Sequence, residues 1–558
     1  MLFISFSAKS QVNFISPLKI PLSLSANFGE LRENHYHSGL DIKTQGVTGK
    51  EVVAADSGYV YLVYVNSVGF GKALFIRHPS GYSTVYGHLE SFSPEIEEYA
   101  KYQQYRNKSF IATIYPPPDR LVVRKGQIIG YSGNSGSSSG PHLHFEIRKS
   151  DSEKPVNPMK FDFGIEDNIK PVIERLAVYP VSRNSSVNGR KRKVFFSVTG
   201  GNGEYRTDDD IVINGTAGFG ITSYDYMNNT SNRFGINSIQ LVIDSIPWYT
   251  YEINEFSFDE SRYINAHIDY EALVRNNMDI EKTFVLPNDK LSLYKNFMNN
   301  GLFDFSDNKT HKVSITVRDG SGNPATISFR VKAGIMAYQD TLAISDSSVT
   351  VMPYGKENLF IRNGVKLKIP KGALYDTLLF RYRESSGNHH LFSKVYHLHD
   401  IYTPLQKAAT LSIIPDSIPA GKSARLLIVR IDERGMQIAA GGKYTEGAVT
   451  ANVLSLGSYA IGIDTVPPSI NANGLASNPD LSLKSEIRIH IKDDFSGINA
   501  YTGLIDGKWA LFEYDAKNEV IFYKFDPTRL TKGIKHTLLI TVSDNCYNVS
   551  VLSREFFW

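Results

Sequence analysis

The stretch that decides the fold is Pro141-His142-Leu143-His144-Phe145-Glu146-Ile147. Apolar residues alternate with polar ones, which indicates a β-strand because successive side chains of a strand point to opposite faces. His142 and His144 then share one face, roughly 6.5–7 Å apart along the strand, and the apolar side chains enter a core. One imidazole of such a pair can bind a metal while the other reaches a nearby water. Two hydrogen-bonded histidines on a solvated sheet face would give the same pattern, so this stretch alone leaves both interpretations open.

Two earlier segments supply partners for this pair. His37-Ser38-Gly39-Leu40-Asp41 places an imidazole and a carboxylate four residues apart, and the glycine-rich, strand-rich surroundings favour a strand or loop over a helix. Tyr86-Gly87-His88-Leu89 follows the strand-like residues 82–85 and predicts a third histidine at a strand end. The spacing of His37 and Asp41 is weak evidence when taken by itself.

Together these segments resemble the lysostaphin/LytM-type zinc endopeptidases, which cut peptide cross-links in peptidoglycan. The resemblance covers roughly residues 17–163 and implies an antiparallel β peptidase domain. It also includes Asn27-Phe28-Gly29, Arg32, the interval from Gly49 to Gly58, and Gly126-Gln127-Ile128-Ile129-Gly130-Tyr131-Ser132-Gly133 leading through Ser139-Gly140-Pro141 into the histidine pair.

The resemblance implies that His37, Asp41 and His144 bind one zinc ion. Three nitrogen and oxygen ligands leave a fourth position for water, as a catalytic zinc requires. His88 and His142 match the family's non-ligand histidines, which are expected to orient or deprotonate that water and to stabilise the oxyanion. The sequence leaves open which of the two accepts the proton. No Ser or Cys nucleophile is needed, so no acyl-enzyme intermediate is expected.

The chain departs from the family pattern between His88 and Gly130, where residues 90–118 form an insertion. Ser93 and Pro94, followed by acidic residues, predict a helix start, and the helix should end before Pro116. The insertion could cap the groove, narrow substrate choice, hold the enzyme inactive, or be a simple surface excursion.

Other histidines do not fit the site. Tyr396-His397-Leu398-His399 resembles the catalytic pair superficially, but it lacks the Gly-Pro lead-in and a nearby His-x-x-x-Asp partner. We therefore interpret His397 and His399, with the neighbouring His389 and His390, as structural. His78 follows an apolar strand and is also interpreted as structural, and the family pattern does not require His35.

The 558 residues suggest three or four domains. We predict a mainly β, multidomain protein in which the peptidase domain is followed by immunoglobulin-like β-sandwich modules. The predicted parts are a signal-peptide and leader remnant at 1–16, the zinc peptidase domain at 17–163, a β module at 164–335, a β-rich domain of unassigned type at 336–463, and a β module at 464–558.

Matching spacings indicate that 164–335 and 464–558 are divergent copies of one module. Gly235 and Gly497 each lie nine residues before an aspartate, Asp244 and Asp506 respectively. Near the end of each copy a histidine is followed eight residues later by an aspartate, and four residues after that by an asparagine; these are His311, Asp319, Asn323 and His536, Asp544, Asn548. We expect the repeated aspartates to cap turns rather than bind a metal.

Composition excludes several classes of protein. Sixty basic and 57 acidic residues give a net charge of +3, which does not indicate nucleic-acid binding. No stretch approaches the roughly 20 apolar residues of a transmembrane helix. The single cysteine, Cys546, excludes an intramolecular disulfide framework and a zinc site built on several thiolates.

The N-terminus is typical of the end of a secretory signal, because the apolar run Leu2–Phe6 precedes the small residues Ser7 and Ala8. The charged front region is missing, so the true start could lie upstream, and a short first strand is the alternative. We expect export to the periplasm or cell envelope, possibly the cell surface, without a lipid anchor.

These observations favour a zinc-dependent endopeptidase that hydrolyses peptide cross-links of bacterial peptidoglycan. Its substrate would be peptidoglycan stem peptides, and the C-terminal β modules could contact an envelope protein. The alternatives are a non-catalytic envelope protein that binds the wall or activates another hydrolase, and a zinc peptidase that acts on proteins. The sequence does not identify the bond that is cut.

Overall fold

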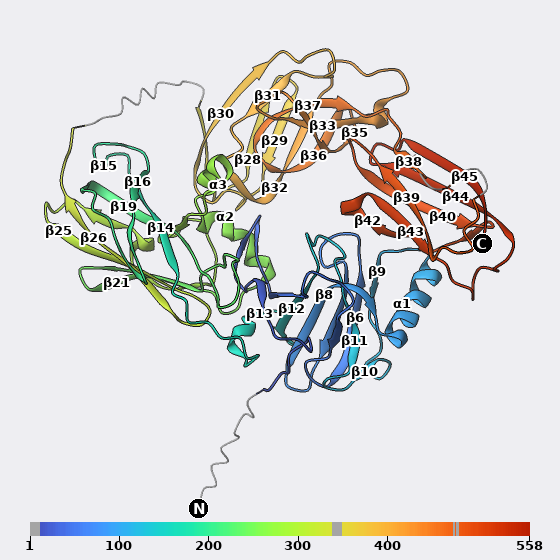
Figure 1. The fold of residues 1–558 in the computed structure, drawn as a ribbon. Coiled ribbons are helices and arrows are strands. Elements are labelled where there is room, and N and C mark those ends of the chain that lie inside the picture. The colour runs from blue at the N-terminus through green and yellow to red at the C-terminus, as the bar shows by residue number, and fades with distance from the viewer. Residues whose placement is uncertain (1–11, 338–348, 473–474, 476–478) are drawn as a thin grey trace, which may run out of the picture.

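The computed structural model describes residues 12–337, 349–472, 475 and 479–558, most of them in or between β-strands. The predicted division into an N-terminal domain (17–163), a first module (164–335), a third region (336–463) and a C-terminal module (464–558) is kept here to describe the ribbon in Figure 1. The C-terminal module returns to lie beside helix α1 (Pro94–Asn107) of the N-terminal domain. The apolar run assigned to a signal lies outside the described residues. Among the described residues, no helix is both long enough and apolar enough to span a bilayer.

The N-terminal domain contains an antiparallel sheet in which β12 (His142–Lys149) lies between β4 (Leu40–Lys43) and β8 (Tyr82–Phe92). Leu143, Phe145 and Ile147 are fully buried, as the alternation predicts. The other strands are β1 (Leu24–Ala26), β5 (Glu51–Val53), β6 (Gly58–Val65), β7 (Lys72–Arg77), β9 (Ala112–Ile114), β10 (Val122–Val123), β11 (Ile128–Ser132) and β13 (Pro155–Val156), and β2 (Leu31–Arg32) pairs with β3 (His35–Tyr36) in a separate ribbon.

The insertion is a helix and a returning strand. Helix α1 begins at Pro94 as predicted, although Ser93 caps it through its carbonyl, which accepts from the Glu97 N–H, and not through its hydroxyl. Ile96 and Ala100 pack in the core of the N-terminal domain, and β9 pairs with β6. The insertion therefore covers the domain's flank, and its outer face is available for another contact.

The first module is one network of 13 strands with short helices, and its core includes residues of the N-terminal domain. Phe28 and Tyr36 belong to this core, with ring centroids 5.4 and 5.7 Å from that of Phe256. The elements are β14 (Val172–Pro180), β15 (Ser186–Val187), β16 (Val194–Ser197), β17 (Thr199–Gly201), β18 (Glu204–Arg206), β19 (Ile211–Tyr224), β20 (Ser238–Ile243), β21 (Ile246–Glu252), α2 (Ile264–His267), α3 (Tyr270–Asn276), β22 (Glu281–Lys282), β23 (Tyr294–Phe297), β24 (Phe303–Phe305), β25 (Thr310–Arg318) and β26 (Pro324–Ala333).

The remaining parts each consist of two sheets. In the third region, His397 contacts the hydroxyls of Ser385 and Ser458 within the sheet. Its strands are β27 (Val349–Met352), β28 (Asn358–Arg362), β29 (Val365–Ile369), β30 (Leu378–Ser385), β31 (Val395–Leu398), β32 (Pro404–Ile413), β33 (Leu426–Ile431), β34 (Gln437–Gly441), β35 (Lys443–Thr445), β36 (Ala448–Ser455) and β37 (Gly457–Ile463). The C-terminal module contains β38 (Ser469–Asn471), β39 (Glu486–Lys492), β40 (Ile498–Ile505), β41 (Lys508–Trp509), β42 (Glu513–Asp515), β43 (Val520–Lys524), β44 (Lys535–Asp544) and β45 (Val549–Phe557).

The two predicted copies share local contacts at equivalent positions. His311 Nδ1 donates to Asp244 at 2.6 Å, and His536 Nδ1 donates to Asp506 at 2.7 Å. The aspartates that begin the last turn, Asp319 and Asp544, each accept hydrogen bonds from backbone N–H groups of the following residues, as expected for turn caps. These matched contacts support the prediction of a repeat, whereas the immunoglobulin-like class stays a prediction.

Candidate metal centre

The three residues predicted to bind zinc lie together where β4 and β12 pair. Asp41 is opposite His144 in the strand register, and His37 precedes β4. His37 Nε2 lies 3.1 Å from both Asp41 Oδ1 and His144 Nδ1, and the last two atoms are 2.9 Å apart. Residues distant in sequence therefore present two nitrogens and one carboxylate oxygen to a common point.

Hydrogen bonds on the outer side of each imidazole orient it. His37 Nδ1 donates to the Asn27 carbonyl at 2.7 Å, so its Nε2 presents a lone pair to the centre. His144 Nε2 donates to Glu146 Oε1 at 2.9 Å, so its Nδ1 does the same. Glu146 is fully buried and is held by the Ser38 hydroxyl and the Arg148 guanidinium, each at 2.5 Å. Such outer contacts fix the tautomer and orientation of metal-binding histidines.

His88 and His142 stand on the other side of the centre. Their ring centroids are 4.7 Å apart, and that of His88 is 5.8 Å from that of His144. His88 Nδ1 donates to the Ser135 carbonyl, and His142 Nδ1 donates to the Gly140 carbonyl, both at 2.9 Å. The buried Nε2 of His142 has no hydrogen-bond partner and lies 3.4 Å from Asp41 Oδ1.

The position of His88 differs from the prediction. It lies inside β8 and not at a strand end, and its φ of 58° is left-handed. At this point β8 leaves its pairing with β12, which ends at Gly87, and pairs with β11 from Leu89 onwards. The resulting kink turns the imidazole toward the other histidines.

Two glycines make room for the centre. Gly87 lies opposite His144, and a Cβ at Gly87 would stand 3.3 Å from that of His144 and 3.2 Å from the Phe70 ring. A Cβ at Gly39 would lie 2.3 Å from the Phe145 carbonyl oxygen, which is far too close. Larger side chains at either position would displace β8 or β4 from β12.

Charges at the centre are strongly coupled. Burial alone would raise the pKa of the Asp41 carboxyl, but His37, His142 and His144 hold it well below its usual range. Burial lowers the pKa of His144, but Asp41 and Glu146 raise it to about 9. Burial, with His144 and His142 nearby, lowers the pKa of His88 to about 3, so His88 is neutral at physiological pH.

The residues present fit a zinc ion. Zinc–ligand distances of about 2.0–2.1 Å in a tetrahedron place ligand atoms roughly 3.3 Å apart, close to the 2.9–3.1 Å separations among His37, Asp41 and His144. The outer hydrogen bonds direct both imidazole lone pairs to the same point, and a two-nitrogen, one-oxygen set is typical of catalytic zinc.

Comparisons with known proteins show which families parts of the chain resemble. Residues 35–115 and 119–158 match the model of peptidase family M23. The chain carries an M23 peptidase domain. Residues 349–464 match the Zu5-like domain, which gives a name to the third region, where sequence analysis found no recognisable motif.

The relatives match over a limited part of the chain. The DD-carboxypeptidase/endopeptidase Mpg of Neisseria meningitidis is 34% identical over 123 residues, which are 22% of this chain and 22% of that protein. The peptidoglycan DD-endopeptidase ShyB of Vibrio cholerae is 29% identical over 139 residues, 24% of this chain and 25% of that protein. A solved catalytic domain of the M23 protein EnpA from Enterococcus faecalis is 26% identical, covers 26% of this chain and 95% of that domain, and has a TM-score of 0.20. The chain thus spans about a fifth to a quarter of the length of these curated relatives.

Sequence reasoning placed the four site histidines and the aspartate in one centre but missed the residues that support them. Glu146 and Arg148 could have been found, because they continue the face of β12 that carries His142 and His144. Asn27 was noted only as part of a motif. Its role depends on a contact with the first module that no local pattern reveals: its side chain exchanges hydrogen bonds with Gly235, 208 residues away.

Proposed function

We propose that this protein is a zinc-dependent endopeptidase that hydrolyses peptide cross-links of bacterial peptidoglycan. The observation that carries the proposal is the convergence of His37 Nε2, Asp41 Oδ1 and His144 Nδ1 on one point, with His88 and His142 beside it. The M23 match and relatives named as peptidoglycan endopeptidases support it. Because peptidoglycan is the substrate, we also propose that the protein acts outside the cytoplasm.

Zinc, when bound, would lower the pKa of a water to about 7 and polarise the scissile carbonyl. Residues of the chain would hold the ion, orient its ligands and transfer protons. Asp41 supplies negative charge to the cation, and Asn27 and Glu146 keep the two ligand imidazoles in the binding tautomer. His88 and His142 each donate from Nδ1 to a backbone carbonyl, which leaves each Nε2 free to accept a proton from the attacking water or, once protonated, to donate to the carbonyl oxygen.

The test is release of muropeptides from purified peptidoglycan by the zinc-loaded full chain. We expect cross-linked dimers to become monomers, and chromatography with mass spectrometry of the products identifies the bond that is cut. His144→Ala should release none, whereas His397→Ala, a histidine of the third region, should behave as the wild type. Zinc bound with stoichiometry near one but no cleavage of any peptidoglycan preparation would contradict the proposal. Preferential cleavage of a protein substrate would contradict it as well.

A further inference from the structure

Three carboxylates gather at the junction between the N-terminal domain and the first module. Asp167 lies in the connecting segment, Asp225 directly follows β19, and Asp319 directly follows β25. One oxygen from each lies within 4.8 Å of the others. Asp225 and Asp319 are only 1% and 2% exposed. Buried carboxylates repel one another and are costly unless something positive compensates them.

The local hydrogen bonds leave one acceptor free. Asp319 is satisfied by the backbone N–H groups of Ser321 and Asn323 and by the Asn323 side chain. Asp167 accepts from the Ile169 N–H. Oδ1 of Asp225 is buried and has no hydrogen-bond partner. A buried, unpaired carboxylate oxygen beside two further carboxylates is a polar group that a bound cation would satisfy.

The electrostatics point the same way. Burial raises the pKa of Asp225 to about 8, and the charges of Asp319 and Asp167 add to the rise. Among the described residues, the backbone N–H of Tyr226 opposes this shift, and it carries no net charge. In the part of the chain that the structure describes, no Lys, Arg or His side chain contributes to the pKa shift of any of the three carboxyls.

We propose that Asp167, Asp225 and Asp319 bind a hard divalent cation of the calcium class, so that Asp319 caps its turn and binds a metal as well, contrary to the expectation from the sequence. All the ligand atoms are oxygens, which favour Ca²⁺ over zinc or copper. Oxygens within 4.8 Å of one another can be bridged by one ion with metal–oxygen distances of about 2.3–2.6 Å. This proposal does not depend on the peptidase activity.

The C-terminal module provides a matched comparison. Asp464, Asp493 and Asp544 form the equivalent cluster, and Asn548 Nδ2 donates to the Asp464 carbonyl just as Asn323 Nδ2 donates to that of Asp167. There, however, each carboxylate accepts from neighbouring backbone N–H groups; Asp493, for example, accepts from those of Phe495 and Gly497. Both predicted copies therefore carry three clustered carboxylates. Among the described residues, only the cluster of the first module has a buried carboxylate oxygen without a hydrogen-bond partner, Asp225 Oδ1.

The cation would stabilise the segment 225–235, which connects the carboxylate cluster to the metal centre. Asp225 pairs with Phe234 through two backbone hydrogen bonds of 2.9 and 3.0 Å, and Met227 and Phe234 pack in the core of the N-terminal domain. Gly235 then binds the side chain of Asn27, whose carbonyl holds His37. Asp225 therefore begins the segment that supports His37, one of the proposed zinc ligands.

The test is calorimetric titration of the zinc-loaded full chain with Ca²⁺, using Asp225→Asn and the matched Asp493→Asn. We expect wild type and Asp493→Asn to bind with a dissociation constant at or below about 1 mM, and Asp225→Asn to bind at least about tenfold more weakly. No binding by the wild type at millimolar Ca²⁺, or undiminished binding by Asp225→Asn, would overturn the proposal.

Thermal unfolding separates a lost site from a damaged fold. In calcium-free buffer above pH 8, where Asp225 is ionised, Asp225→Asn should unfold at a higher temperature than the wild type, because one of three repelling charges is removed. Added Ca²⁺ should raise the unfolding temperature of the wild type and not that of Asp225→Asn. An equal rise in both proteins would place the cation elsewhere and refute the assignment.

Discussion

The two modules predicted to be copies of one another contact the N-terminal domain in different ways. The first module shares its hydrophobic core with Phe28 and Tyr36 and holds Asn27 through Gly235. Tyr501, Leu511 and Tyr514 of the C-terminal module pack against the core on the other side, and ion pairs and a ring contact join the module to the insertion and the adjacent sheet. These contacts are the ion pairs Lys72–Glu513 (2.8 Å) and Lys101–Asp526 (2.6 Å) and the ring contact Tyr105–Trp509 (5.1 Å). The insertion is thus a docking surface for the last module.

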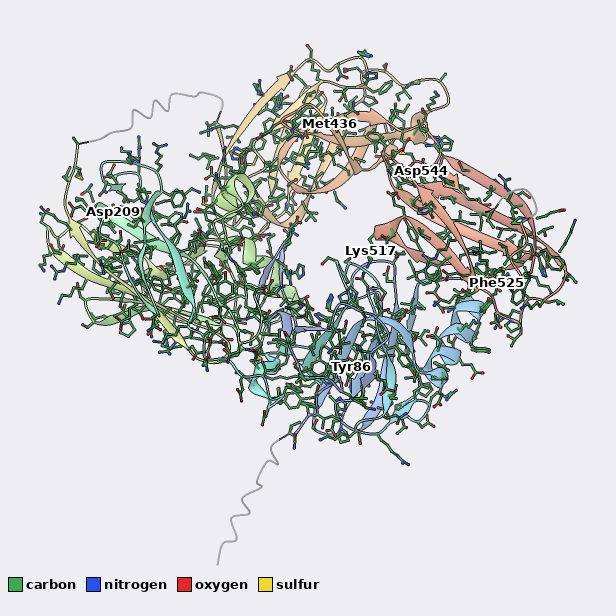
Figure 2. All side chains as sticks on the ribbon, viewed as in Figure 1. Tyr86, Asp209, Met436, Lys517, Phe525 and Asp544 are labelled. Atoms are coloured by element: carbon green, nitrogen blue, oxygen red, sulfur yellow. The ribbon has the colours of Figure 1, made fainter. Side chains whose placement is uncertain are left out.

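Each module also reaches a different half of the metal centre. The first supports His37, a proposed ligand, through Asn27. The second places Lys517, at the tip of the hairpin between β42 and β43, on the carbonyls of Asn134 and Ser138 (Figure 2). The loop 134–138 contacts the two non-ligand histidines. The Ser135 carbonyl accepts from His88, and the Ser138 hydroxyl lies 3.1 Å from His142 Nδ1. The first module therefore contacts the side of the proposed ligands, and the C-terminal module contacts the side of the two other histidines.

The largest expected effect distinguishes the proposed ligand His144 from the non-ligand His142. His144→Ala should lose both zinc and activity, because it removes a ligand. His142→Ala should keep zinc stoichiometrically and lose turnover by roughly 10²–10⁴-fold, the usual contribution of a general acid–base group. Zinc content by atomic absorption beside muropeptide release measures both. Equal loss of zinc in the two variants would show that the pair is wrongly assigned.

Most residues of this centre could be predicted from the sequence, but the contacts from other modules that hold them in place could not. Alternation along β12 fixes which side chains share a face, so His142 and His144 were placed correctly before any tertiary contact was known. The link between Lys517 and Ser138 joins residues 379 positions apart and depends on how whole modules dock. His88 was misplaced at a strand end because a left-handed residue within a strand has no signal in the sequence pattern.

The next largest effect tests the docking of the C-terminal module. Glu513→Gln leaves the ammonium of Lys72, only 6% exposed, without its carboxylate, and breaking one partner of a buried pair costs about 3 kcal/mol. We expect faster hydrogen exchange in α1 and in the hairpin between β42 and β43, with the first module unchanged. Glu519→Gln, on the same hairpin but half-exposed, is the control. Unchanged exchange in Glu513→Gln would mean that the module is held by other contacts.

A smaller effect tests the support from the first module. Asn27→Ala removes both side-chain hydrogen bonds to Gly235 but keeps the carbonyl that accepts from His37. We expect about tenfold weaker zinc binding in competition with a chelator, as is usual when an outer contact of a ligand histidine is loosened. Asn518→Ala, on the C-terminal hairpin, should leave zinc affinity unchanged. Equal zinc affinities for wild type and Asn27→Ala would show that the first module does not support the zinc ligands through Asn27.

The smallest effect concerns Lys517. Its ammonium binds two carbonyls of the loop that orients His88 and His142, so Lys517→Ala should loosen that loop without touching the ligands. We expect turnover of muropeptides to fall several-fold while zinc affinity stays at the wild-type value, the opposite pattern to Asn27→Ala. The exposed Lys508→Ala in the same module controls for loss of charge. A rise in turnover would instead mean that the hairpin restrains the enzyme, and weaker zinc binding would mean that both modules act on the ligand side.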